Sequence, residues 1–246
     1  MRAFGDGSLF GEVSGDGPAR VLALHGWGRR GIDFAQSLQG ISYIALDLPG
    51  FGATPAPAAA MGAQGYAQAI ESVLVDCPAP IVLVGHSFGG RVAVHLAASH
   101  PDRVSGLILT GVPLLKRKVS TGSSPVFRMA RWAAGRGLVP SSVIESMRRR
   151  YGSSDYRAAR GVMRDVLVIA VNESYERELE ALRVPIELLW GAEDREVPVV
   201  IAERAADLLA VGGHDVNLVV EAGVGHLLPV TAPQALRRSV EAMINR

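Results

Sequence analysis

Short apolar runs recur along this chain, and more polar stretches separate them. The runs lack the alternation of apolar and polar residues that marks a strand with one solvent-exposed face. We therefore expect strands that are buried on both faces of a parallel sheet. The stretches between them repeat apolar residues three or four positions apart, which is the spacing of helices that cover a sheet. The expected strands are residues 20–24, 41–46, 81–84, 104–110, 186–190 and 216–221, and the expected helices are 32–38, 66–75, 91–99, 200–209 and 233–244.

This alternation of strands and helices predicts the α/β class, with a doubly wound and mostly parallel sheet. Residues 8–13 are expected to add an edge strand or a hairpin. Between 113 and 183 the alternation breaks, because the pattern there is helical and contains no convincing strand. We therefore expect a core of residues 1–112 and 184–246, with a helical cap (lid) inserted at 113–183. Its helices are expected to start near 124–125, 140–142 and 153–155.

Composition fits one large α/β domain with such an insertion. The chain has 246 residues, of which 48% are hydrophobic, and its one cysteine, Cys77, excludes an intramolecular disulfide. We see no apolar signal segment near the N-terminus and no run as long as a membrane span, so we expect a cytoplasmic protein. Histidine and cysteine do not cluster at metal-ligand spacing, and we expect neither a metal nor a cofactor.

Charge is distributed unevenly along the chain. Residues 115–165 hold twelve Lys and Arg residues against three acidic ones, a net charge of +9 in a chain whose net charge is +1. Two interpretations stay open. The basic segment binds an anionic substrate or an acidic carrier protein, or it forms a solvated outer face of helices. It lacks the regular aromatic residues of a nucleic-acid site, so we expect no nucleic-acid partner.

The clearest chemical signal is the sequence IVLVGHSFGG at residues 81–90. It predicts a buried strand that ends in Gly-x-Ser-x-Gly and passes at once into a helix. Gly85 and Gly89 keep such a turn free of side chains where backbones approach each other, while Ser87 takes a strained conformation that exposes its hydroxyl. The helix N-terminus behind it favours negative charge. Ser87 is therefore the candidate nucleophile.

A serine nucleophile needs a base and a group that orients the base. His226 is the best candidate base, because it lies in a Gly-rich loop after the last expected strand. Asp194 follows the strand before that and is the best orienting acid, with Glu193 as its nearest competitor. The order Ser, Asp, His fits this type of fold. His86 precedes the nucleophile, and we expect its side chain to point elsewhere.

Acyl transfer also needs two N–H donors for the oxyanion of the transition state. We expect one from Phe88, the residue after the nucleophile, and one from Trp27 in the glycine-containing loop 24–28. The alternative for that loop is a simple glycine turn that closes the strand.

Six phrases occur in order: HGWG at 25–28, LDLPGFG at 46–52, GHSFGG at 85–90, HPDRV at 100–104, the phrase around Asp194 and Gly225-His226. Together they resemble the α/β-hydrolase superfamily. The resemblance implies that Ser87, Asp194 and His226 form a catalytic triad, that 113–183 is the family's cap and that Asp47 is structural. Serine as the nucleophile argues against the haloalkane dehalogenases and epoxide hydrolases, which use aspartate.

A weaker resemblance is to the biotin-pathway carboxylesterases that demethylate a pimeloyl-carrier-protein methyl ester. That family presents cap arginines to an acidic carrier protein, but it has Trp where this chain has His86. We expect a serine hydrolase that cleaves a carboxylic ester or thioester through an acyl-enzyme. Two alternatives remain: C–C bond hydrolysis of a dienone or diketone, and a binding protein without turnover on a hydrolase scaffold.

Overall fold

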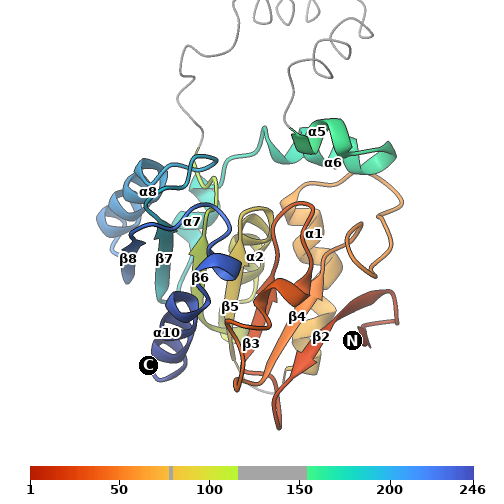
Figure 1. The fold of residues 1–246 in the computed structure, drawn as a ribbon, viewed down its shortest axis with the longest axis horizontal. Helices are drawn as coiled ribbons and strands as arrows, with labels where there is room; N and C mark the ends of the chain where they lie inside the picture. Colours follow the sequence, from red (N-terminus) through yellow and green to blue (C-terminus); the bar gives the residue numbers. More distant parts are fainter. Residues whose placement is uncertain (78–79, 116–153) are drawn as a thin grey trace, which may run out of the picture.

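The computed structural model describes residues 1–77, 80–115 and 154–246. In these residues one eight-stranded sheet has the order β1-β2-β4-β3-β5-β6-β7-β8 (Figure 1). Strands β3 to β8 are parallel, whereas β1 and β2 form an antiparallel hairpin at one edge. The strands are β1 Arg2–Phe4, β2 Leu9–Ser14, β3 Val21–Leu24, β4 Tyr43–Asp47, β5 Ile81–His86, β6 Val104–Thr110, β7 Ile186–Gly191 and β8 Val216–Glu221.

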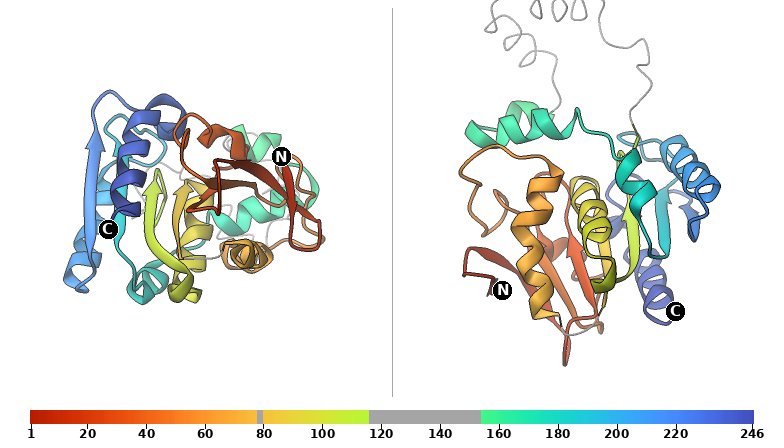
Figure 2. Two further views of the ribbon diagram at one scale, coloured as in Figure 1. Left: turned by 90° about the horizontal axis from the view of Figure 1, so that it is seen from below. Right: turned by 180° about the vertical axis from the view of Figure 1, so that it is seen from behind.

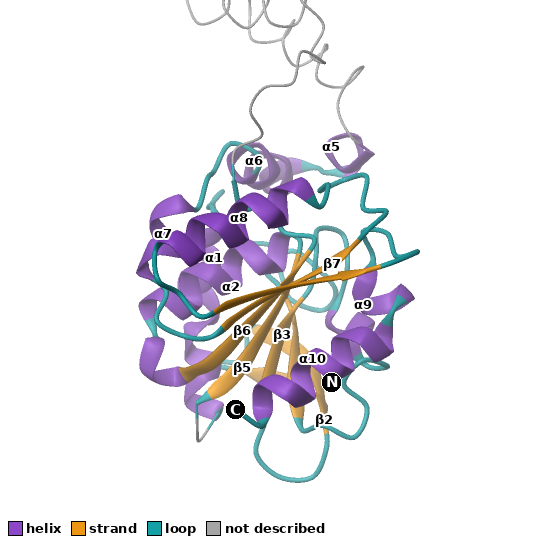
Figure 3. Ribbon diagram, turned by 90° about the vertical axis from the view of Figure 1, so that its left-hand side faces the viewer, coloured by secondary structure: helices purple, strands orange, loops and turns teal. Residues whose placement is uncertain are grey.

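Helices cover both faces of the sheet (Figures 2 and 3). One face carries α1 Ala63–Ile70, α2 Phe88–Ser99, α7 Glu176–Ala181 and α8 Val200–Val211, and the other carries the 3-10 helix η1 Gly31–Phe34 with α9 Leu228–Thr231 and α10 Pro233–Ile244. Two more 3-10 helices are η2 Glu71–Asp76 and η3 Pro101–Arg103. The predicted doubly wound α/β architecture is confirmed.

The continuous apolar pattern of the strands follows from this layering. In β3, Leu22 and Leu24 pack into the core beneath α1 and α2, while Val21 and Ala23 pack into the core beneath α10. All four side chains are fully buried. Because successive strand residues point to opposite faces, a sheet covered on both faces needs apolar residues at every position.

The N-terminal segment and two of the expected helices compare with the sequence expectation as follows. Residues 8–13 belong to the β1–β2 hairpin, which matches one of the two options. The expected helix at 32–38 is only the short η1, whose first N–H, on Gly31, donates to the carboxylate of Asp47 and holds the segment against β4. The expected helix at 66–75 begins earlier, at Ala63, and changes to 3-10 geometry at Glu71.

The segment predicted as a cap is described only from residue 154 onward. The expected helix starts near 124–125 and 140–142 lie outside the described residues. Near the third, α5 spans Ser154–Ala158 and is followed by α6 Gly161–Ala170. Both helices lie over the carboxyl ends of the strands, whereas α7 packs against α2 within a layer that covers the sheet (Figure 1). The domain boundaries themselves remain a prediction.

Helices α5 and α6 contact the core through apolar side chains. Tyr156, Ala159 and Leu167 form a small cluster against Trp27, which follows β3. The sulfur of Met163 lies 3.8 Å from the hydroxyl of Tyr66 in α1. These contacts place α5 and α6 over the loop predicted to supply an oxyanion donor. None of the described helices is long and apolar enough to cross a membrane.

Candidate active site

Ser87 lies at the sharp turn between β5 and α2. Its φ of 49° and ψ of −112° make it the only non-glycine residue with positive φ among the described residues. A Cβ atom on Gly85 would lie 2.4 Å from the Cα of Gly90, and one on Gly89 would lie 2.2 Å from the carbonyl oxygen of Leu24. Glycine is therefore required at both positions, and the strained turn predicted from the sequence is present.

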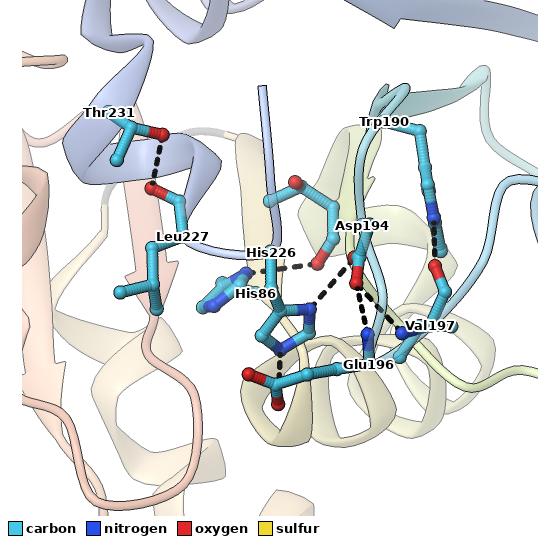
Figure 4. Close-up of polar contacts among 9 residues, drawn as sticks. His86, Trp190, Asp194, Glu196, Val197, His226, Leu227 and Thr231 are labelled. Carbon is cyan, nitrogen blue, oxygen red and sulfur yellow. Dashed lines mark hydrogen bonds and ion pairs between the residues drawn. The ribbon is translucent and has the colours of Figure 1, made fainter. Parts of the chain in front are cut away.

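Asp194 and His226 are joined by a hydrogen bond. Nδ1 of His226 donates to Oδ2 of Asp194 over 2.8 Å (Figure 4). The other carboxylate oxygen of Asp194 accepts the backbone N–H groups of Glu196 and Val197 at 2.9 and 2.8 Å. The Asp194 side chain is buried, while neighbouring Glu193 is exposed. Of the two acids considered, Asp194 is the one that orients the imidazole.

The loops after β7 and β8 are fixed to each other. The backbone N–H of Glu193 donates to the carbonyl of Val224 at 2.9 Å, and the indole N–H of Trp190 donates to Val197 at 2.8 Å. A Cβ atom on Gly191 would lie 2.3 Å from the same Val224 oxygen, so glycine permits this close approach. Backbone contacts thus set the distance between the turn that carries Asp194 and the loop that carries His226.

Residues 110 and 111 lie between Ser87 and the pair formed by Asp194 and His226. The N–H of Ser87 donates to the carbonyl of Thr110 at 2.9 Å. A Cβ atom on the next residue, Gly111, would lie 2.9 Å from Nδ1 of His226 and 3.3 Å from Oδ2 of Asp194. The structure therefore brings all three predicted residues around the end of β6. Among the described contacts, Ser87 makes no side-chain hydrogen bond to His226.

The pKa of His226 reflects its carboxylate neighbours. Burial by itself lowers this pKa, because the interior disfavours the charged ring. The hydrogen bond and charge of Asp194 outweigh burial, and the charges of Glu196 and Asp155 add to them, so the pKa is raised above its usual value. The site thus favours the imidazolium that forms when this ring accepts a proton.

The loop after β3 lies against the nucleophile turn. A Cβ atom on Gly26 would lie 3.3 Å from the Cβ of Ser87. The ring of Trp27 packs edge-on against Phe88, with ring centroids 5.4 Å apart. In the described residues, the backbone N–H groups of Trp27 and Phe88 have no hydrogen-bond acceptor. Both predicted oxyanion donors therefore have free N–H groups among the described residues, and their segments pack against each other beside Ser87.

Two buried polar side chains hold this loop. Nδ1 of His25 donates to the carbonyl of Gly26 at 2.7 Å, and Nε2 accepts the N–H of Leu48 at 3.0 Å, so the ring is neutral. Burial lowers its pKa accordingly. The carboxylate of Asp47 accepts the N–H groups of Gly31 and Ala53 at 2.8 and 2.9 Å, which confirms its expected structural role.

Comparison with known proteins agrees with this geometry. A family model described as the alpha/beta hydrolase family matches residues 21–238. The chain belongs to the alpha/beta hydrolase family. The solved structure of an esterase, EaEST from Exiguobacterium antarcticum, superposes on this chain over 100% of both chains with a TM-score of 0.74. At 21% identity, that likeness shows the fold alone.

Curated relatives match parts of this α/β hydrolase. A pimeloyl-acyl-carrier protein methyl ester esterase of Vibrio atlanticus (strain LGP32) is 34% identical over 142 residues, which are 54% of this chain and 48% of the relative. Lipase LipV of Mycobacterium tuberculosis (strain ATCC 25618 / H37Rv) is 44% identical over 97 residues, 38% of this chain and 37% of the relative. The chain thus spans about half the length, or less, of these relatives.

Three residues of this α/β hydrolase lie beside His226 although the sequence did not predict it. The expectation that His86 points elsewhere is wrong, because its ring lies 4.9 Å from the ring of His226. Gly111 lets His226 and Asp194 approach β6, and Glu196 places a carboxylate oxygen 3.6 Å from Nε2 of His226. Only the proximity of Glu196 to Asp194 in the sequence was a usable signal; the other two depend on tertiary packing. Among the described residues, no group of three or more His, Cys, Asp and Glu is placed to hold a metal.

Proposed function

We propose that this α/β hydrolase cleaves carboxylic esters or thioesters with a catalytic triad of Ser87, His226 and Asp194. The observation that carries the proposal is the 2.8 Å hydrogen bond from His226 to the buried Asp194 beside a serine held at φ 49°. A base that is oriented by an acid and lies close to a serine in a strained turn is the arrangement that nucleophilic acyl transfer requires.

In the first step Ser87 Oγ attacks the acyl carbonyl, and Nε2 of His226 takes the hydroxyl proton. Asp194 keeps the other ring nitrogen, Nδ1, protonated and stabilises the imidazolium. The carbonyl oxygen becomes an oxyanion, which the free N–H groups of Trp27 and Phe88 stabilise. The imidazolium then gives its Nε2 proton to the departing alcohol or thiol, and the acyl group remains on Ser87.

In the second step water attacks the acyl-enzyme. Nε2 of His226 takes a proton from the water, and the same two N–H groups bind the second oxyanion. The imidazolium returns its proton to Ser87 Oγ as the acid leaves. Relatives that are named esterases and a lipase support ester hydrolysis over C–C hydrolysis and over binding without turnover.

We propose further that the basic segment at 115–165 attracts an anionic substrate or an acidic carrier protein, in a cytoplasmic enzyme with no nucleic-acid partner and no cofactor. Its net charge of +9 supports this, as does the relative that acts on a carrier-protein ester. The part of the segment from 116 to 153 lies outside the described residues. If the charge acts by steering, kcat/KM for a carrier-linked ester falls steeply with salt, whereas kcat/KM for a neutral aryl ester does not.

The test of the catalytic assignment is Ser87→Ala. We expect the variant to lose hydrolysis of p-nitrophenyl butyrate and labelling by a fluorophosphonate probe, with an unchanged circular dichroism spectrum. Ser105→Ala is the matched control, because Ser105 is exposed near the opposite end of β6 and should keep both activities. Full activity in Ser87→Ala would overturn the assignment. A wild-type enzyme that is labelled by the probe but turns over only a ring-fission dienone would indicate C–C hydrolysis.

A further inference from the structure

His226 lies between two carboxylates. Its Nδ1 pairs with Asp194 at 2.8 Å, and its Nε2 lies 3.6 Å from Oε2 of Glu196 (Figure 4). Nε2 is the atom that must receive the proton of Ser87 in the proposed reaction. A second carboxylate therefore occupies the side of the imidazole where the chemistry takes place.

Resting on the proposed function, we propose that Glu196 pairs with the protonated form of His226 and competes with Ser87 for Nε2. Glu196 is thus a positioning residue that acts through the base. Its presence shifts the onset of activity to higher pH.

The turn that carries Asp194 also sets the position of Glu196. The backbone N–H of Glu196 donates to Oδ1 of Asp194, so the residue that orients the base also fixes the start of the Glu196 side chain. The carboxylate is attached to a rigid backbone, yet the side chain is 68% exposed. It can approach Nε2 without a burial cost and can rotate away when substrate enters.

The competition depends on which form of the ring is present. Protonated His226 has an Nε2–H to donate, and a facing carboxylate stabilises that form. Neutral His226, with its remaining proton on Nδ1 toward Asp194, offers a lone pair at Nε2 instead. That lone pair repels the Glu196 carboxylate and accepts the hydroxyl proton of Ser87. Loss of the Nε2 proton to solvent as pH rises therefore releases Glu196 and activates the nucleophile.

Other groups around the imidazole do not duplicate this role. Asp194 binds Nδ1 and is present in both protonation states. His86, from the end of β5, is buried and neutral. Asp155, at the start of α5, adds a weaker attraction for the charged ring. Glu196 is the carboxylate that the described contacts place at Nε2, and it also contributes to the raised pKa of His226.

The variant Glu196→Gln keeps the backbone hydrogen bond and the length of the side chain but removes the charge. We expect the acid limb of its kcat/KM profile for p-nitrophenyl butyrate to move to lower pH. Relative to the value at pH 8, kcat/KM near pH 5.5 should rise about two- to threefold at low salt, the size expected for an exposed pair. Sodium chloride at 1 M should move the wild-type limb in the same direction and the Glu196→Gln limb much less.

Glu193→Gln is the matched control, because Glu193 lies on the same turn, is exposed and makes no described ion pair with His226. Its profile should match the wild type. Superimposable profiles for wild type and Glu196→Gln would overturn the proposal, as would an equal shift in Glu193→Gln, which would indicate a general charge effect.

An NMR titration separates this proposal from the catalytic assignment. The Cε1–H signal of His226 is followed against pH in Ser87→Ala and in Ser87→Ala with Glu196→Gln, neither of which needs turnover. We expect a lower pKa for His226 in the double variant. A shift there with no ester turnover by the wild type would support the Glu196 pair and contradict the proposed function. Equal titration curves would contradict the pair itself.

Discussion

The imidazole rings of His86 and His226 lie 4.9 Å apart, measured between their centroids. His86 is buried, and its Nδ1 donates to the carbonyl of Thr110 at 3.1 Å. Burial and the neighbouring charge of His226 lower the pKa of His86 to about 3. His86 therefore stays neutral when His226 is protonated, and the proposed base packs against an uncharged ring.

Replacing His86 should affect stability and activity together. His86→Leu keeps an uncharged side chain beside His226 but removes the N–H that donates to Thr110. The carbonyl of Thr110 also accepts the N–H of Ser87. We expect a loss of about 1 kcal/mol in the free energy of unfolding, because the hydrogen bond to Thr110 is removed. We also expect a lower kcat/KM, because His226 loses the ring against which it packs. Urea unfolding and steady-state kinetics measure the two effects. His100→Gln, at a half-exposed histidine away from the site, should change neither.

The buried histidines also predict how stability depends on pH. The pKa values of His86 and His25 are lowered in the folded chain, mainly by burial. At mildly acidic pH the unfolded chain therefore binds protons at these two residues, whereas the folded chain does not. The free energy of unfolding should therefore fall as pH drops below about 6.5 toward 3. His226 acts in the opposite direction, because its pKa is raised and its contribution is lost as pH rises.

Urea unfolding at pH 7.5 and pH 5 in wild type and His86→Leu isolates the contribution of His86. The variant should lose less stability between the two values, since it lacks one group that resists protonation. An equal loss in both proteins would show that His86 is not the group responsible.

Much of the fold could be predicted from the sequence, because local pattern and tertiary role agree in the core. The strand at β8 was predicted with its observed bounds, and β6 likewise. The prediction at residues 32–38 was too long, since only the short η1 forms there, and its start is tied to Asp47 by a tertiary hydrogen bond from Gly31. Such a contact between segments far apart in the sequence leaves no local signal.

The candidate site also contains residues that the sequence predicts and residues that it does not. Ser87, Asp194 and His226 carry motif signals at the ends of strands, and the structure gathers them. The orientation of His86 and the need for glycine at 111 depend on how the loop after β8 packs on β6. The local sequence cannot reveal that packing, because a histidine at the end of β5 and a glycine after β6 are both ordinary residues for a strand end.

Glu173, which lies between α6 and α7, should stabilise the N-terminus of α1. Its carboxylate accepts the N–H of Ala63, at the start of α1, at 3.2 and 3.3 Å, and the hydroxyl of buried Tyr175 donates to it at 2.7 Å. Glu173→Ala removes a charge that caps a helix N-terminus, and we expect a loss of about 1–2 kcal/mol in the free energy of unfolding. Amide hydrogen exchange at the first turn of α1 should also become faster. Exposed Glu180→Ala is the control and should change neither measurement.

Gly111 should be needed for catalysis more than for stability. A Cβ atom there would lie 2.9 Å from Nδ1 and Cε1 of His226, and the residue has φ of 60°. Gly111→Ala should therefore displace the imidazole and lower kcat at least tenfold, since small displacements of a catalytic base are costly. The left-handed backbone adds about 1 kcal/mol of destabilisation.

Gly213→Ala separates these two effects. Gly213 has φ of 77°, and a Cβ atom there would meet nothing within 4 Å. We expect a similar loss of stability by urea unfolding but unchanged kcat, because this turn precedes β8 at the end of the strand remote from His226. If the two variants lose activity equally, the effect at Gly111 comes from backbone strain, and the close packing of His226 against β6 is not what positions the base.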